Sequence, residues 1–65
     1  DYCTVQTGID TGRVNLRACA GTSCGVLSVL ADGQALQVID VGDWLKVRTS
    51  DNLTGYIYSK FCKGK

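Results

Sequence analysis

The fold class can be predicted from the stretch GVLSVLADGQALQVIDVGDWLKVRTSDNLTGYIYS, residues 25–59. It contains short runs of apolar or alternating residues, at 25–30, 34–40, 44–49 and 54–59. These runs are separated by turn-forming triplets rich in Gly, Asp and Asn, at 31–33, 41–43 and 50–52. Alternation with a period of two, broken at short intervals by such triplets, is typical of antiparallel strands. Because the connections are so short, we expect the consecutive runs to pair as a meander.

Two further segments extend this pattern toward the N-terminus. VNLRA (14–18) alternates regularly, and YCTVQT (2–7) is a weaker candidate for a strand. No segment has a convincing helical period. Five or six short strands predict an all-β domain, a small antiparallel barrel whose closure removes exposed sheet edges. The side chains expected to form its core are Val14, Leu16, Val26, Leu30, Leu36, Val38, Val47 and Ile57.

Four cysteines in 65 residues suggest how so small a domain is stabilised. A single core of this size leaves only a few kcal/mol of net stability, so covalent staples are expected. A zinc site is disfavoured because the chain has no histidine and only Cys19 and Cys24 form a close pair. A redox centre is disfavoured because such centres prefer a Cys-x-x-Cys motif at a helix N-terminus. We therefore expect disulfides, which are typical of secreted proteins.

Charge and hydropathy exclude several classes of function. Seven basic and six acidic residues give a net charge of +1, which offers little basic surface for nucleic acid. No apolar stretch approaches the length of a membrane span, and no signal peptide is visible. A secreted chain would therefore have lost its signal, or would be a piece excised from a longer protein.

Catalytic groups are scarce. The chain has neither histidine nor glutamate, so its serines and threonines have no obvious base to activate them. Asp40 and Asp43 are the nearest candidates for a glycosidase pair, but they flank a predicted tight turn, where Asp is favoured for conformational reasons. We expect a protein that is not an enzyme and that has no cofactor and no metal.

The ordered motifs resemble the bacterial-type SH3 domain. Asn-Leu-Arg at 15–17, Gly33, Trp-x-x-Val at 44–47 and Gly-Tyr-Ile at 55–57 carry the resemblance, which spans about Val14 to Phe61. The cysteines and the absence of proline look most like the SH3-like domains of secreted fungal cell-wall lytic enzymes, muramidases in particular. The resemblance implies a single SH3-like domain over residues 1–65, excised from a larger secreted enzyme.

The chain departs from the family pattern in one loop, which bears on the cysteine pairing. Many relatives continue Asn-x-Arg with Ser-Gly-Pro, whereas this chain has Ala-Cys-Ala-Gly at 18–21. A Cys19–Cys24 disulfide would pin this loop where relatives use proline, and Cys3–Cys62 would tie together the chain ends that a closed barrel brings close. Chain entropy gives about 2 kcal/mol for the short loop and about 4 kcal/mol for the long one.

Aromatic residues supply the first candidates for ligand binding. Tyr56 and Tyr58 share one face of their strand, about 6 to 7 Å apart, while Ile57 points to the other face. Flat rings with a hydroxyl suit stacking on sugars and hydrogen bonding to N-acetyl groups. Two alternatives stay open: Tyr56 packs on the barrel end, and Trp44 either caps the core or lines the groove. Tyr2 is a further candidate.

Polar residues supply the others. Asn15 and Arg17 share the polar face of their strand, where each is either a ligand contact or an ordinary surface residue. Arg17 has a further alternative role, bracing the next loop through a salt bridge. The remaining candidates for hydrogen bonds to a ligand are Asp10, Asp32, Thr22 and Ser23.

Two functions follow from the resemblance and the aromatic face. The first is a secreted, non-catalytic module that binds cell-wall polymer containing N-acetylglucosamine, either peptidoglycan or chitin-type glycan, and targets an attached lytic enzyme. The second is a peptide-binding module, for a peptidoglycan stem peptide or a protein partner, or a small secreted inhibitor that uses the same groove. Neither nucleic acid nor membrane is expected as a partner.

Overall fold

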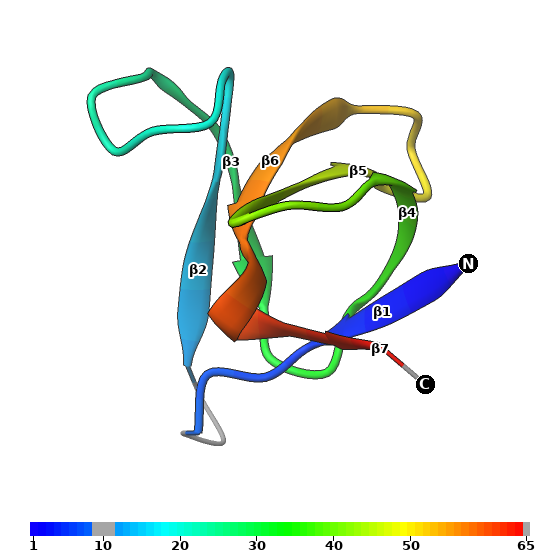
Figure 1. Ribbon diagram of the computed structural model, residues 1–65. Coiled ribbons are helices and arrows are strands. Elements are labelled where there is room, and N and C mark those ends of the chain that lie inside the picture. Colours follow the sequence, from blue (N-terminus) through cyan, green and yellow to red (C-terminus); the bar gives the residue numbers. More distant parts are fainter. Residues whose placement is uncertain (9–11, 65) are drawn as a thin grey trace.

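The computed structural model describes residues 1–8 and 12–64, which form an all-β domain. Seven strands make one antiparallel sheet in the order β3-β2-β6-β5-β4-β1-β7, and the sheet curls into a small barrel (Figure 1). The elements are β1 (Tyr2–Val5), β2 (Arg13–Arg17), β3 (Val26–Ala31), β4 (Ala35–Asp40), β5 (Trp44–Arg48), β6 (Thr54–Tyr58), the 3₁₀ turn η1 (Ser59–Phe61) and β7 (Cys62–Gly64). This arrangement confirms the predicted fold class.

The meander is confirmed for three of its four runs. Strands β4, β5 and β6 pair in sequence order, but β3 pairs with β2 and lies at the edge of the sheet. The chain turns a corner between β3 and β4 at Gly33, whose φ of +91° lies in the region that glycine adopts most readily. Hydrogen bonds from Gly33 N to Val5 O (2.8 Å) and from Val5 N to Gln34 O (2.9 Å) fix this corner against β1. A short connection therefore did not mean a paired hairpin.

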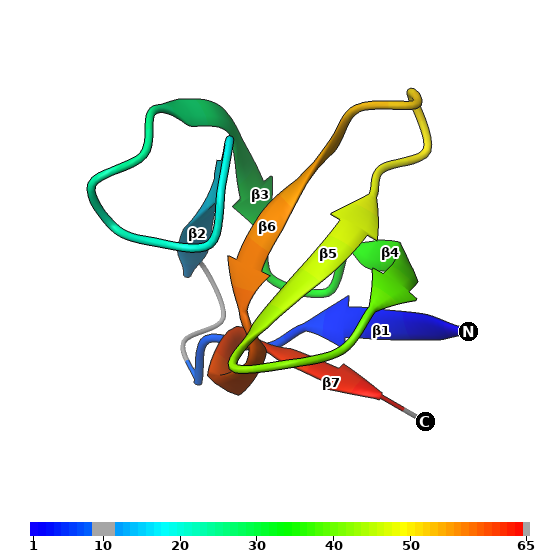
Figure 2. The ribbon, with the colours of Figure 1, turned by 45° about the horizontal axis from the view of Figure 1, so that its top comes forward.

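Strand β7 was not predicted. It is only three residues long, so alternation could not reveal it, and it pairs with β1 in the register Val5↔Cys62. Figure 2 shows β1 and β7 side by side, with the two termini at the same end of the pair. The predicted proximity of the two chain ends is thus achieved by strand pairing as well as by a disulfide.

The core lies inside the curled sheet. Five of the predicted core residues are fully buried: Leu16, Leu30, Leu36, Val47 and Ile57. Val14 and Val38 pack against this cluster while partly exposed, and the structure adds Cys3, Val5, Leu45 and Cys62 to it.

Val26 was wrongly assigned to the core, because its side chain is 49% exposed. The register between β2 and β3 shifts after the Leu16↔Ser28 pair, so that Val26 lies opposite Arg17. Such a bulge inserts one extra residue into a strand and turns the side chains beyond it to the other face. Simple alternation along β3 could not reveal this shift.

Gly55 allows β2 and β6 to approach each other. A Cβ atom at this position would lie 2.8 Å from the backbone oxygen of Arg17 and 2.8 Å from Cγ of Leu16. The two strands pair at Arg17↔Tyr56, next to this contact. The absence of a side chain therefore permits the contact that joins the β2–β3 pair to the rest of the sheet.

Both predicted disulfides are present. Cys3–Cys62 joins β1 to β7, with its Cα atoms 5.5 Å apart, and both cysteines are buried. Cys19–Cys24 closes the loop between β2 and β3, with its Cα atoms 5.7 Å apart and Cys19 exposed. The chain's four cysteines are all paired in these two bonds.

Candidate ligand-binding groove

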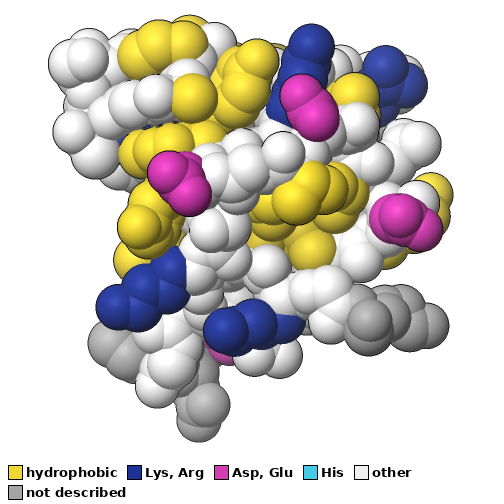
Figure 3. Space-filling view, in the orientation of Figure 1, with side chains coloured by type: hydrophobic (Ala, Val, Ile, Leu, Met, Phe, Trp, Pro, Cys, Tyr) yellow, Lys and Arg dark blue, Asp and Glu magenta, His cyan; other side chains and the backbone are white. Residues whose placement is uncertain are grey.

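An open groove of about 530 Å³ lies between β2, the loop that follows it, and η1. The turn η1 is held at this position by backbone hydrogen bonds from Ser59 N to Asp43 O (3.0 Å) and from Gln6 N to Phe61 O (2.8 Å). The groove is lined by Thr7, Arg13, Val14, Asn15, Arg17, Thr22, Trp44, Tyr58, Lys60 and Phe61. Hydrophobic and basic side chains adjoin on the left of the face in Figure 3, beside β2 and η1.

Three aromatic rings form a continuous row in the groove. Trp44 and Tyr58 lie opposite each other on β5 and β6, and their rings meet edge to face, with centroids 5.4 Å apart at 67°. Phe61, on η1, extends the row, with its centroid 6.2 Å from that of Tyr58. Trp44 is partly buried and lines the groove, which answers one question that the sequence left open. Offset and edge-to-face contacts of this kind are favourable and hold rings in place.

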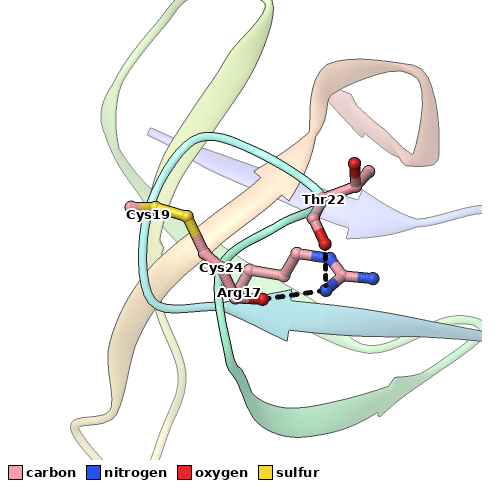
Figure 4. Close-up of a disulfide and its surroundings, with 4 residues drawn as sticks. All are labelled: Arg17, Cys19, Thr22 and Cys24. Carbon is pink, nitrogen blue, oxygen red and sulfur yellow. Dashed lines mark hydrogen bonds between the residues drawn. A yellow bond between two sulfur atoms is a disulfide. The ribbon is translucent and has the colours of Figure 1, made fainter.

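Arg17 ties the loop between β2 and β3 to the edge of the groove. Its Nη1 donates to the backbone oxygens of Thr22 and Cys24, both at 3.0 Å. Figure 4 shows the guanidinium reaching these carbonyls, with the Cys19–Cys24 disulfide beyond them. Arg17 thus braces the loop by hydrogen bonds to carbonyl groups, where a salt bridge had been considered. The brace and the disulfide together position Thr22 at the groove.

Strand β2 presents three polar side chains to the groove. Arg13, Asn15 and Arg17 are two residues apart from one another, so they project from the same face of the strand at intervals of about 6.6 Å. All three line the groove. The polar face that the sequence predicted for Asn15 and Arg17 therefore faces the aromatic row.

Five of the ten predicted ligand residues line this groove, and the others lie elsewhere. Tyr56 lies between Arg17 and Lys46 in the sheet register, outside the groove lining. Asp32 accepts hydrogen bonds from Thr7 N (2.7 Å) and Thr7 Oγ1 (3.1 Å) and is not part of the groove lining. Ser23 is exposed beside Thr22 and does not line the groove. Asp10 falls outside the described residues.

Tyr2 belongs to a second groove, of about 730 Å³, on another part of the barrel. Val38, Val41 and Leu45 contribute apolar side chains to it, and the Cys3–Cys62 disulfide lies along it. Tyr2 is 59% exposed and has no aromatic contact with the row formed by Trp44, Tyr58 and Phe61 in the described part of the chain. Of the predicted aromatic residues, Trp44 and Tyr58 therefore line the first groove, Tyr2 lines the second, and Tyr56 lines neither.

Sequence reasoning missed five residues of the first groove: Thr7, Arg13, Val14, Lys60 and Phe61. Val14 was counted only as core, although it is partly exposed and lines the groove as well. Lys60 and Phe61 reach the groove through η1, a single turn without alternation in its sequence. Arg13 could have been found, because it continues the two-residue spacing of Asn15 and Arg17.

Several aspartates lie in turns, and two of them, Asp40 and Asp43, were weighed as a glycosidase pair and flank the connection between β4 and β5. Asp40 Oδ1 accepts a hydrogen bond from Val41 N (2.9 Å) in the turn between β4 and β5. A hydrogen bond from the Thr49 hydroxyl lowers the pKa of Asp51, in the turn before β6. Within residues 1–8 and 12–64, no three His, Cys, Asp or Glu side chains are grouped so as to hold a metal ion.

The described residues form a small β-barrel with an open groove, which is lined by three aromatic rings and three basic side chains. The sequence profile of the bacterial SH3 domain matches residues 12–63, and the chain belongs to this family. Bacterial SH3 domains are binding domains, generally non-catalytic, and commonly bind cell-wall components. A comparison with curated proteins finds no match to the sequence.

Two further findings concern the surroundings in which the protein works. The two disulfides suggest an oxidising, extracellular environment, because cytosolic thiols are kept reduced. None of the helical segments in the described residues is long and apolar enough to span a membrane.

Proposed function

We propose that the protein is a non-catalytic module that binds cell-wall polymer containing N-acetylglucosamine, either peptidoglycan or chitin-type glycan. In this proposal residues 1–65 form one domain of a larger secreted protein and hold an attached lytic enzyme, such as a muramidase, against its substrate. The observation that carries the proposal is the row of three rings, Trp44, Tyr58 and Phe61, beside the polar face of β2.

Each part of the groove has a role in this proposal. Tyr58 is 41% exposed, and in this proposal its accessible ring stacks on the apolar face of a sugar. Trp44 and Phe61 flank it and hold its orientation by ring contacts. Asn15, with a side-chain amide, and Thr22, with a hydroxyl, supply donors and acceptors for N-acetyl and hydroxyl groups.

The openness of the groove fits weak binding at each site. An exposed groove on a small domain leaves much of a ligand in water, so affinity at a single site is modest. Tethering to an enzyme makes such binding effective, because the polymer offers many sites and the linker keeps the enzyme close to them. The proposal therefore predicts clear retention on insoluble polymer and weaker binding to short oligomers.

The test is a pull-down of the folded protein on insoluble peptidoglycan and on chitin, with cellulose as the control polymer. Retention on one or both of the first two, and not on cellulose, supports the proposal. Failure to bind either, with the fold verified by circular dichroism, refutes it.

Binding of a peptide in the same groove is the second candidate. The basic side chains of Arg13 and Lys60 favour it, because they could receive the carboxyl groups of a peptidoglycan stem peptide. Separate titrations with N-acetylglucosamine oligomers and with a stem peptide distinguish the candidates, followed by fluorescence of Trp44 in the groove wall. Saturation by the peptide alone would favour this second function.

A further inference from the structure

The charge of the aromatic groove differs from that of the chain as a whole. Overall, seven basic residues are nearly balanced by six acidic ones. The groove lining contains Arg13, Arg17 and Lys60, and none of the aspartates in residues 1–8 and 12–64 is part of it. Nearly half of the basic side chains therefore converge on one groove beside three aromatic rings.

Arg13 and Lys60 are available to a ligand. Both side chains are exposed, and neither makes an ion pair with a carboxylate in the part of the chain that the structure describes. Asp32 is held near the groove by hydrogen bonds from the backbone N and the hydroxyl of Thr7. Arg17 uses Nη1 for the loop carbonyls but keeps its positive charge at the groove. The cations thus face the groove without being neutralised by the described residues of the groove wall.

A neutral glycan would not use this charge. Rings and hydrogen-bonding groups are enough to bind N-acetylglucosamine, whereas three like charges brought together repel one another unless an anion lies between them. A bound carboxylate would lie beside Arg13 and Lys60 in the same groove that Trp44 and Phe61 line. The arrangement is complementary to a saccharide that carries a negative charge.

We propose that the groove selects an N-acetylated glycan bearing carboxylate groups over the neutral chitin-type chain. This inference rests on the proposed function and narrows its ligand class. Tyr58 stacks on a sugar ring, while Arg13 and Lys60 receive a carboxylate on the same or the next residue of the ligand. In peptidoglycan the carboxylate belongs either to the lactyl group of N-acetylmuramic acid or to the stem peptide attached there.

The experiment compares four soluble probes by titration calorimetry, with amide shifts in NMR spectra to locate each one. The probes are an N-acetylglucosamine tetramer, a tetrasaccharide alternating N-acetylglucosamine with N-acetylmuramic acid, the same tetrasaccharide with its carboxylates amidated, and an isolated stem peptide. We expect the acidic tetrasaccharide to bind about five- to tenfold more tightly than the neutral tetramer at low salt. Amidation should remove the advantage, and about 0.5 M salt should greatly reduce it.

Variants connect the preference to the two cations. Arg13→Gln and Lys60→Gln should each lower the affinity for the acidic tetrasaccharide by about two- to fivefold and leave that for the neutral tetramer nearly unchanged. Arg48→Gln and Lys63→Gln are charge-matched controls, since both side chains are exposed and lie outside the groove lining. We expect these controls to preserve the preference.

The outcomes separate this inference from the proposed function. Equal affinity for acidic, amidated and neutral saccharides would overturn the carboxylate preference and leave glycan binding standing. Binding of the stem peptide alone, as tight as that of the acidic saccharide, would overturn it too, because no sugar would then be needed. Loss of preference in the control variants would show a general charge effect and also contradict it. Failure of all four probes and of the insoluble polymers would refute the proposed function itself.

Discussion

Individual side chains in the groove have separable effects, and the aromatic row provides the first test. Tyr58 is 41% exposed, so truncating its side chain should affect binding more than folding. We expect Tyr58→Ala to weaken binding to N-acetylated saccharides by about five- to tenfold, as a stacking contribution of about 1 kcal/mol implies. Titration followed by NMR measures the change.

Tyr2→Ala is the matched control for this prediction. Tyr2 is an exposed tyrosine in the second groove, and it was also a candidate from the sequence. A loss of affinity in Tyr2→Ala with none in Tyr58→Ala would show that the ligand binds in the second groove, which would contradict our proposal.

Gly55 provides a second test at the residue scale, one of stability. A methyl group there would collide with the Arg17 oxygen and the Leu16 side chain, each 2.8 Å away. We expect Gly55→Ala to lower the free energy of unfolding by about 2 to 3 kcal/mol, because overpacking forces backbone and side chains apart. Urea denaturation measures this difference.

Gly25→Ala is the control, since a Cβ atom there meets nothing within 4 Å. We expect it to change the free energy of unfolding by less than about 1 kcal/mol. Similar losses in both variants would contradict the view that Gly55 permits a close approach of strands.

At the scale of elements, the loop between β2 and β3 depends on two constraints. The Cys19–Cys24 disulfide closes the loop, and Arg17 binds the carbonyls of Thr22 and Cys24. We expect replacement of both cysteines by serine to cost about 2 kcal/mol of stability and to leave the barrel folded. Affinity for N-acetylated saccharides should fall as well, because Thr22 would no longer be fixed at the groove. Unfolding curves and titrations measure the two effects separately.

A selective reduction offers an independent version of this test. Cys19 is exposed, whereas Cys3 and Cys62 are buried, so mild reductant should open the loop disulfide first. Mass spectrometry after thiol alkylation identifies which bond has opened. Unchanged affinity in the loop-reduced protein would show that the disulfide does not position the groove.

The strands themselves show how far local pattern determines structure. Alternation identified β2, β4, β5 and β6 correctly. A strand with one buried face has apolar side chains at every second position, because successive side chains point to opposite faces. Alternation did not reveal β7, because three residues are too few to show a period of two. It also assigned Val26 to the wrong face, because the bulge between β2 and β3 turns this side chain outward. Alternation also did not show that β3 pairs with β2 and not with β4, because strand pairing depends on contacts with other segments of the sheet.

At the scale of the whole molecule, the Cys3–Cys62 disulfide joins residues that are 59 positions apart in sequence, and both cysteines belong to the buried core. We expect replacement of both cysteines by alanine to cost about 4 kcal/mol through the entropy of the unfolded chain alone. A 65-residue domain has a small free energy of unfolding, so this variant should be largely unfolded near body temperature. Thermal unfolding followed by circular dichroism measures the loss.

The comparison with the loop disulfide makes this prediction specific. Both variants remove one disulfide, but the chain-entropy cost grows with the length of the closed loop. A larger loss of stability on removing Cys19–Cys24 than on removing Cys3–Cys62 would contradict the argument.

The amino-acid sequence was enough to predict the all-β class, most of the strands and turns, and most of the core, because alternation and turn residues are local properties. Together with the family resemblance it also gave the cysteine pairing, which the structure confirms. The order of the strands in the sheet, and the set of side chains that meet in the groove, became known from the three-dimensional structure. The groove lining includes residues from distant parts of the chain, such as Thr7, Thr22, Trp44 and Lys60. A local sequence pattern cannot predict that such residues lie close together. Their meeting depends on the closure of the barrel, the bulge in β3 and the position of η1, each of which is fixed by contacts between segments far apart in sequence.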